Sequence, residues 1–306
     1  LKLIDQYDWP GYIEISTPKN KRQQILDIDK KLKNRVGIAL SQQSMSEETL
    51  KLIKRENLKK DEYINFVKEL ESRGKICGCE LIIPLPNETK QSYFESTKIL
   101  LDCGVNIGTY TLMMLQGAEL GRVEAVKKYG MKSKWRLVPR DFGEYRGKKI
   151  FDIEKVCIAN NTMPYEDYLE CRRFSFLLDF FSYSLFSPIR RLLEKDLDIS
   201  YYEFLFSAFN NLEKDIKNID IKNPIYKIAK IYSEFSFESE KELFDSKEDI
   251  YNFYSKDENY KKLLNSELGD NLLRKYAAKT IAEALDEVID FSINTILKIM
   301  EKKTNA

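Results

Sequence analysis

The sequence contains no histidine, which removes the commonest general base and the commonest zinc ligand from any mechanism. Chemistry on this chain must therefore use carboxylates, lysine, tyrosine, cysteine or a bound cofactor. The cysteines are few and odd in number, which argues against a disulfide scaffold: Cys77, Cys79, Cys103, Cys157 and Cys171. Cys77 and Cys79 are two residues apart and could bind a metal, although packing as small buried thiols is the commoner role.

Polar residues next to apolar segments are the other candidates for chemistry. Ser41 and Gln43 follow the apolar segment 35–40, where they could bind ligand hydroxyl groups or form a polar loop before a helix. Arg55 lies at the predicted end of that helix, where a cation is also favoured for structural reasons. Glu80 lies in an otherwise apolar segment, so it must be hydrogen-bonded if buried, or else face solvent or pair with a lysine.

The elements that position these residues alternate between strand and helix. Hydrophobic patterns predict strands at 12–17, 35–40, 75–83 and 105–115. They predict helices at 21–33, from Ser46 to about Arg55, and at 60–73, 89–102 and 119–129. This order is typical of a parallel sheet with right-handed crossovers, and strands of this number suggest half of a (β/α) barrel. In such barrels the functional residues lie in the loops that follow the strands.

The pattern changes after about residue 150. Strands are no longer predicted, and long helical stripes rich in aromatic residues begin, at 165–195, 200–217, 224–240, 247–264 and 268–302. We expect most of the aromatic side chains there to form a core. The sequence therefore predicts two domains, a partial barrel over 1–150 and a helical domain over 151–306.

Several motifs occur in the order found in one enzyme family. The segments ALSQQSMSEETLKLIKREN and CELIIPLPNETKQSYFEST resemble the second half of a radical S-adenosylmethionine (SAM) barrel. The segments MMLQGAELG, YGMKSKWRLVPRDFGEY and NNTMPYEDYLECRR resemble, more specifically, radical SAM proteins that contain a B12-binding domain. The resemblance covers about residues 10–185. It implies an α/β fold, with the C-terminal half of a radical SAM (β/α) barrel of about four parallel strands followed by an all-helical C-terminal domain.

The resemblance also implies a SAM site. Gln43 matches a glutamine of the ribose motif, Arg55 matches the arginine that binds the SAM carboxylate, and Glu80 matches the acid that binds the ribose hydroxyls. The loop 83–88 matches the motif that packs on adenine. The implied cofactor-binding residues are Ser41, Gln43, Arg55, Glu80, Ile83, Leu85 and Glu88.

The sequence differs from the family pattern in several respects. The usual Gly-Leu-Pro-Gly-Glu-Thr begins here with Pro84, which lacks the freedom of glycine to adopt positive φ and to allow close ligand approach. The Cys-x3-Cys-x2-Cys motif that holds a [4Fe–4S] cluster is absent from the sequence, as is the cobalamin-binding domain. Because the chain begins at Leu1 rather than Met, we expect the cluster and cobalamin to belong to an upstream region.

We therefore predict the C-terminal portion of a cobalamin-dependent-type radical SAM enzyme that binds SAM for radical or methyl-transfer chemistry on a small-molecule substrate. The alternative is a truncated or degenerate barrel that acts as a non-catalytic module for binding a ligand or a protein. Joint retention of Gln43, Arg55 and Glu80 favours the enzyme, whereas Pro84 and the missing cysteine motif favour the module.

Charge and hydropathy restrict the partners and the location. Charged residues make up 32% of the chain but leave a net charge of +1, so neither nucleic acid nor an anionic membrane is indicated as a partner. The longest apolar stretch, 174–189, contains Asp179 and several serines and is too short to span a bilayer. With few cysteines and no signal peptide, a cytoplasmic location is expected.

Overall fold

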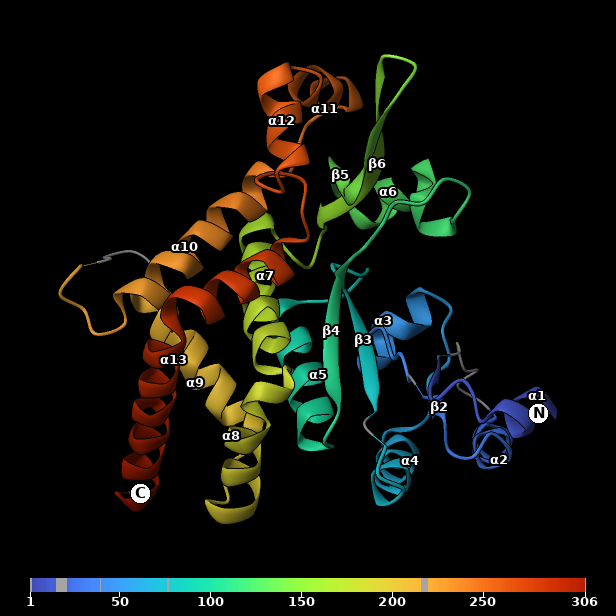
Figure 1. Cartoon of the computed structure of the whole chain (residues 1–306), viewed down its shortest axis with the longest axis vertical. Coiled ribbons are helices and arrows are strands. Elements are labelled where there is room, and N and C mark those ends of the chain that lie inside the picture. The colour runs from blue at the N-terminus through green and yellow to red at the C-terminus, as the bar shows by residue number, and fades with distance from the viewer. Residues whose placement is uncertain (1, 15–20, 39, 76, 216–219, 306) are drawn as a thin grey trace. The chain divides into compact units, whose positions relative to one another are not determined.

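The computed structural model describes residues 2–14, 21–38, 40–75, 77–215 and 220–305 (Figure 1). The chain forms two compact units. The first contains Leu1–Ile82 and Gln91–Tyr110, and the second contains Ile83–Lys90 and Thr111–Ala306. The two units are separated because contacts within each are denser than contacts between them, and residues 111–150 belong to the same unit as the helical region. It does not test the predicted domain boundary near residue 150.

Short parallel strands form the sheets of the first half of the chain. Strand β1 (Ile13–Glu14) pairs in parallel with β2 (Val36–Gly37), and β3 (Gly78–Ile83) pairs with β4 (Asn106–Thr111). The backbone bonds from Asn106 N to Cys77 O and from Leu112 N to Ile83 O advance in the same direction, so β3 and β4 are also parallel. The predicted strands are thus present but short, and residues 15–17 of the first lie outside the described part. Within that part the strands form separate two-stranded sheets, and a barrel is not seen.

The helices between these strands follow the predicted patterns. They are α1 (Lys2–Tyr7), α2 (Arg22–Lys31), α3 (Glu47–Leu52), α4 (Lys60–Ser72) and α5 (Lys90–Asp102). Helix α3 begins after Ser46, whose side chain accepts a hydrogen bond from Thr49 N at 3.3 Å. Helix α4 buries Tyr63, Phe66, Val67 and Leu70, which lie on one face at helical spacing.

A long antiparallel hairpin lies at 132–159, for which no strand was predicted, and its second strand extends past residue 150, after which strands were expected to be absent. It consists of β5 (Lys132–Tyr145) and β6 (Lys148–Ala159), so the expectation that strands end near residue 150 was wrong. The strands join at Arg146 and Gly147, both with positive φ, as the tight turns that match strand twist require. A register shift between Leu137 and Phe142 surrounds Pro139 and interrupts the alternation that would have indicated a strand.

The remaining elements of the second unit are helical (Figure 1). They are η1 (Glu119–Gly121), α6 (Val123–Tyr129), α7 (Tyr165–Phe181), η2 (Ser184–Phe186), α8 (Ser187–Arg191), η3 (Leu192–Asp196), α9 (Tyr201–Asp215), α10 (Tyr226–Lys241), α11 (Lys247–Tyr254), α12 (Asp257–Leu264) and α13 (Leu272–Thr304). The predicted helix 165–195 is therefore divided after Phe181, where α7 ends and shorter helices follow, and the predicted helix 247–264 is divided at Ser255. The predicted helical C-terminal region is confirmed.

Aromatic side chains form much of the core of this helical region, as predicted. Phe174 of α7 lies 5.2 Å from Phe209 of α9, and Phe176 stacks at 4.7 Å on Phe235 of α10, measured between ring centroids. Aromatic rings at these separations attract each other, which adds to the stabilisation that comes from burying their apolar surface. No helix of the described part combines the length and the apolar composition that a membrane crossing would need.

Candidate functional site

The structure brings three predicted SAM-binding residues together in the first unit. Ser41 Oγ donates to Glu80 Oε2 at 2.8 Å. Gln43 N donates to Glu80 O at 2.8 Å, and Ile82 N donates to Gln43 O at 3.0 Å, so the segment after β2 runs beside β3. Glu80 is exposed on its strand, between the buried Cys79 and Leu81. It therefore faces outward, as one of the two sequence interpretations allowed, and its partner is Ser41 rather than a lysine.

Gln43 has two unusual features. Its backbone φ is +62°, a conformation that non-glycine residues seldom adopt and that occurs most often at functional sites and turns. Its side-chain Oε1 is buried and has no hydrogen-bond partner among the residues that the structure describes. A buried carbonyl of this kind is an available acceptor for a donor such as a hydroxyl group.

Arg55 lies three residues past α3, in a segment that is tied to the same loop. Its backbone N donates to Leu50 O at 2.9 Å, and its side chain is exposed. Asn57 Nδ2 donates to Gln42 O at 2.9 Å and to Ser44 O at 3.0 Å. These bonds hold residues 55–57 against the loop that contains Ser41 and Gln43. An exposed guanidinium on such a segment is free to bind an anion.

The remaining predicted residues lie on the loop 83–88 of the second unit, and their side chains are buried. Ile83, Leu85 and Glu88 have exposed fractions of only 1%, 2% and 2%. Asn160 Nδ2 donates to Leu85 O at 2.8 Å, and Thr162 Oγ1 donates to Glu88 O at 2.8 Å. Two motifs of the family resemblance, 84–89 and 160–173, are thus bonded to each other. Contact between this loop and adenine stays a prediction.

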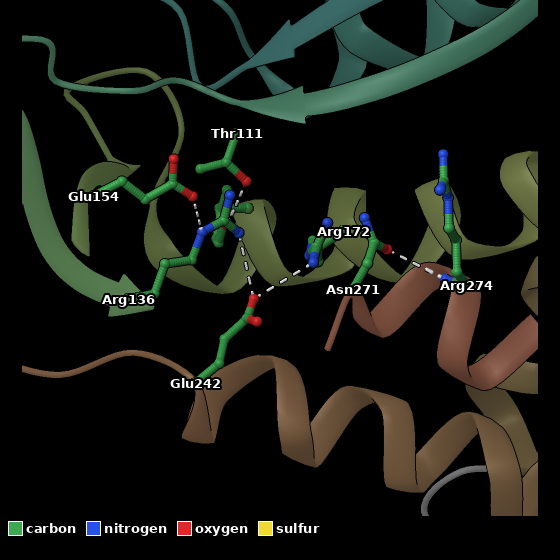
Figure 2. Close-up of polar contacts among 8 residues, drawn as sticks. Thr111, Arg136, Glu154, Arg172, Glu242, Asn271 and Arg274 are labelled. Atoms are coloured by element: carbon green, nitrogen blue, oxygen red, sulfur yellow. Dashed lines mark hydrogen bonds and ion pairs between the residues drawn. The ribbon is translucent and has the colours of Figure 1, made fainter. Parts of the chain in front are cut away.

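A network of polar side chains, which we call the Arg–Glu network, lies in the second unit near the end of β4 (Figure 2). Arg136 on β5 donates through Nε to Glu154 Oε1, its cross-strand neighbour on β6, at 2.5 Å. Glu242, which follows α10, accepts from Arg136 Nη1 and Arg172 Nη2, each at 3.4 Å. Nearby, Thr111 Oγ1 at the end of β4 lies 3.0 Å from the Tyr168 hydroxyl, and either can donate.

The charges of the Arg–Glu network compensate each other. Two guanidinium groups face two carboxylates, and their side chains are only 10–20% exposed. Burial alone would lower the pKa of Arg136, but the carboxylates of Glu242 and Glu154 outweigh it and raise that pKa. Arginine does not release its proton at neutral pH, so this network orients the hairpin, α7 and α10 rather than transferring protons.

Sequence reasoning missed the Arg–Glu network. Its members come from four separate elements, and no short motif contains them. The sequence feature that could have indicated the network is Arg172, because it is a charged residue among the mostly apolar buried residues of α7. A buried cation requires a partner, which would have pointed to a carboxylate from another element.

Asp179, an acidic residue on α7, has fewer favourable contacts for its charge than the carboxylates of the Arg–Glu network have. Asp179 Oδ2 is buried, and no described residue forms a hydrogen bond to it. Burial raises the pKa of Asp179, against the opposing effect of Arg274 and Arg172. Arg274 lies in the first turn of α13, where its backbone N donates to the capping side chain of Asn271 at 3.2 Å, and Figure 2 shows its guanidinium extending away from that cap.

The cysteines do not form a metal centre in the structure. All of them are described and none is in a disulfide; Cys77, Cys79, Cys157 and Cys171 are buried. Within the described part of the chain, no group of three or more histidine, cysteine, aspartate or glutamate side chains could hold a metal ion. Burial raises the pKa of Cys77 to about 12 and that of Cys157 to about 11, which suits packed thiols rather than metal-binding thiolates.

Comparison with known proteins identifies two similar methyltransferases. The chain is 28% identical, over 176 residues that make up 55% of its length, to the cobalamin-dependent radical SAM methyltransferase TokK of Streptomyces tokunonensis. It is 25% identical, over 204 residues and 64% of its length, to the 2-(S-pantetheinyl)-carbapenam-3-carboxylate methyltransferase of Streptantibioticus cattleyicolor. No protein-family model matches the chain.

The extent of these matches limits what they show. They cover 25% and 29% of the two relatives, so the chain spans little more than a quarter of the length of the curated proteins it matches. Over about half of its length, the chain therefore has weak similarity to cobalamin-dependent radical SAM methyltransferases. This similarity supports a related enzyme family, in agreement with the resemblance noted in the sequence.

Proposed function

We propose that this chain is the C-terminal portion of a cobalamin-dependent-type radical SAM methyltransferase and that it supplies part of the SAM site. The observation that carries the proposal is the bonded group formed by Ser41, Gln43 and Glu80. By the family resemblance, Gln43 and Glu80 match residues that bind the ribose of SAM, and Ser41 is bonded to Glu80. Similarity to two methyltransferases supports the reaction class.

The chemistry of the three residues suits a ribose. The two ribose hydroxyls of SAM need acceptors, and the Glu80 carboxylate has capacity for a further hydrogen bond beyond the one from Ser41. The buried Gln43 Oε1, which has no partner in the described part of the chain, would supply another acceptor. Arg55, on the segment that Asn57 ties to the same loop, would bind the SAM carboxylate through its guanidinium.

The iron–sulfur cluster does not fit the residues of this chain. The sequence has no Cys-x3-Cys-x2-Cys segment, and the described residues contain no metal-binding group. The proposal therefore places the cluster and cobalamin in an upstream region of the parent enzyme. This chain would contribute SAM binding and a helical region, and no chemical step is assigned to a cluster on it.

We further propose that the substrate is a small molecule and that the parent enzyme acts in the cytoplasm. The name of one relative specifies a carbapenam carboxylate that carries a pantetheinyl group. The low, odd number of cysteines and the net charge of +1 agree with a reducing compartment and with a partner other than nucleic acid.

The proposal is tested by measuring SAM affinity of the full-length parent polypeptide by isothermal titration calorimetry. Arg55→Ala and Glu80→Gln should each weaken SAM binding by about 1–3 kcal/mol, because each removes a charged hydrogen-bond partner. Arg73→Ala is a matched control, since Arg73 is an exposed arginine that pairs with Glu69 at the end of α4. Its affinity for SAM should be unchanged.

The alternative, a non-catalytic module, is favoured by one feature of the structure. The side chains of Ile83, Leu85 and Glu88 are almost fully buried in the protein, whereas an adenine platform needs an accessible surface. If SAM affinity is unaffected by Arg55→Ala and by Glu80→Gln, or if the parent does not bind SAM, the enzyme proposal fails and the module becomes the better description.

A further inference from the structure

A cavity of about 430 Å³ lies within the second unit, and none of the proposed SAM-binding residues is among those that line it. Residues of β5, α10, α11, α12 and α13 line it. Its apolar wall comes from Leu137, Phe244, Phe253, Tyr254 and Leu272. Cavities of this size that combine an apolar wall with a few polar groups are typical of small-molecule sites.

The wall of the cavity is supported by a separate small core. Leu137 and Tyr254 belong to a buried cluster formed by the hairpin, α11 and α12, against which Phe244 and Phe253 pack. The ring centroids of Phe253 and Tyr254 lie 5.0 Å apart, and those of Phe244 and Tyr254 lie 5.8 Å apart. Burial raises the pKa of Tyr254 to about 12, so its phenol remains a hydrogen-bond donor at neutral pH. The wall is therefore fixed by packing before any ligand arrives.

The acidic residues that line the cavity are already paired with cations. Glu238 binds Lys275 at 2.8 Å. Glu242 binds the two arginines of the Arg–Glu network, and Asp270 lies 3.8 Å from Arg140. None of these carboxylates is thus available to attract a cationic ligand.

Three lysines line the cavity, and ion pairs with carboxylates are found in the described part of the chain for two of them. Lys262 pairs with Glu258 at 2.8 Å, and Lys275 pairs with Glu238. Lys241 is exposed, and the contact that the described part of the chain gives its ammonium group is the ring of Phe237, at 4.3 Å from the centroid. The cavity therefore has an excess of positive charge at Lys241 beside an apolar wall.

We propose that this cavity binds an organic anion with an apolar body, whose carboxylate pairs with Lys241 and whose body packs on Phe244, Phe253 and Leu272. The charge excess selects an anion, because the acids in the cavity are neutralised by the protein itself. The apolar wall selects an extended hydrocarbon or aromatic body over a small inorganic ion. This site is independent of SAM binding and stands whether or not the SAM proposal holds.

The proposal is tested by titrating the full chain with octanoate by isothermal titration calorimetry, using octan-1-ol as the neutral probe of the same length. Lys241→Gln should weaken octanoate binding roughly fivefold through loss of the charged contact. It should leave octanol binding unchanged. Lys241→Arg retains the charge and should restore octanoate binding. Lys230→Gln is the matched control, because Lys230 is an exposed lysine on the same helix that does not line the cavity, and it should behave as the unchanged chain.

Two results would overturn the proposal. One is an unchanged chain that does not bind octanoate. The other is octanoate binding that is equal in the unchanged chain, in Lys241→Gln and in Lys230→Gln, which would place the probe elsewhere. Because Lys241 is exposed, its substitution should not unfold the protein, and an unchanged circular dichroism spectrum verifies this.

Discussion

Replacement of Glu242 by glutamine should destabilise the second unit, because two buried arginines share this carboxylate. The Arg–Glu network has two positive and two negative charges, so Glu242→Gln leaves a net charge of +1. Arg136 keeps Glu154 at 2.5 Å, but Arg172, with a side chain only 10% exposed, loses its carboxylate partner.

The expected size of this effect follows from the geometry. Breaking a buried ion pair by removing one partner costs about 3–5 kcal/mol. Here both contacts to Glu242 are long, at 3.4 Å, and its side chain is 20% exposed, which lowers the cost. The glutamine amide also retains an acceptor. We therefore expect the free energy of unfolding to fall by about 2–3 kcal/mol.

The assay uses a tryptophan in the second unit. The chain has two tryptophans, of which Trp135 lies on β5 and Trp9 lies in the first unit. In a Trp9→Phe background, urea unfolding followed by tryptophan fluorescence therefore reports the second unit. Glu240→Gln, which changes an exposed acid near the C-terminal end of α10, is the control and should change the free energy of unfolding by less than about 0.5 kcal/mol.

A double variant separates charge imbalance from simple loss of contacts. Arg172→Met with Glu242→Leu leaves Arg136 paired with Glu154 and a net charge of zero, and apolar replacement of a buried pair is often tolerated. The double variant should therefore be more stable than Glu242→Gln. The reasoning is refuted if Glu242→Gln is as stable as the Glu240→Gln control.

Three further predictions concern other parts of the chain. The pKa of Asp179 is raised in the folded state above its ordinary value of 3.8, so the unchanged protein loses stability as the pH rises through the folded-state pKa. Asp179→Asn lacks this loss and should be more stable, relative to the unchanged protein, at pH 7 than at pH 3. Urea unfolding at both pH values measures the difference in free energy of unfolding, and an equal difference at the two pH values would contradict the prediction. Asn160→Ala should cost about 2–3 kcal/mol in urea unfolding, since Asn160 holds buried carbonyls of Pro84 and Leu85, whereas the exposed Asn161→Ala should cost little. A thiol reagent should label Cys103 before any other cysteine, since it alone is only half-buried, and mass spectrometry showing first labelling elsewhere would contradict this.

The local elements of this chain were largely predictable because their signals are local. Ser46 marks the start of α3, and the spacing of Tyr63, Phe66 and Leu70 marks the buried face of α4. Strand lengths were overestimated, since pairing rather than β-branched composition decides how far a strand extends. The hairpin after residue 131 was missed because Pro139 and a register shift interrupt its alternation.

The proximity of three candidate site residues could be predicted for a similar reason, whereas their role in binding SAM stays a prediction. Ser41, Gln43 and Glu80 lie on neighbouring parallel segments, so their proximity follows from the order of the strands. The burial of Leu85 was not foreseeable from the motif, because the loop that contains it is bonded to Asn160, which lies 75 residues away in the sequence. The Arg–Glu network depends likewise on long-range contacts, which the sequence pattern of one element does not reveal.

The central claim is that this chain is part of a longer cobalamin-type radical SAM methyltransferase. The most direct test is to sequence the gene upstream of the codon for Leu1. We expect an in-frame Cys-x3-Cys-x2-Cys segment within about half a barrel's length, preceded by a further α/β domain. A start codon next to Leu1, with no such segment in frame, would contradict the account and leave the non-catalytic binding module.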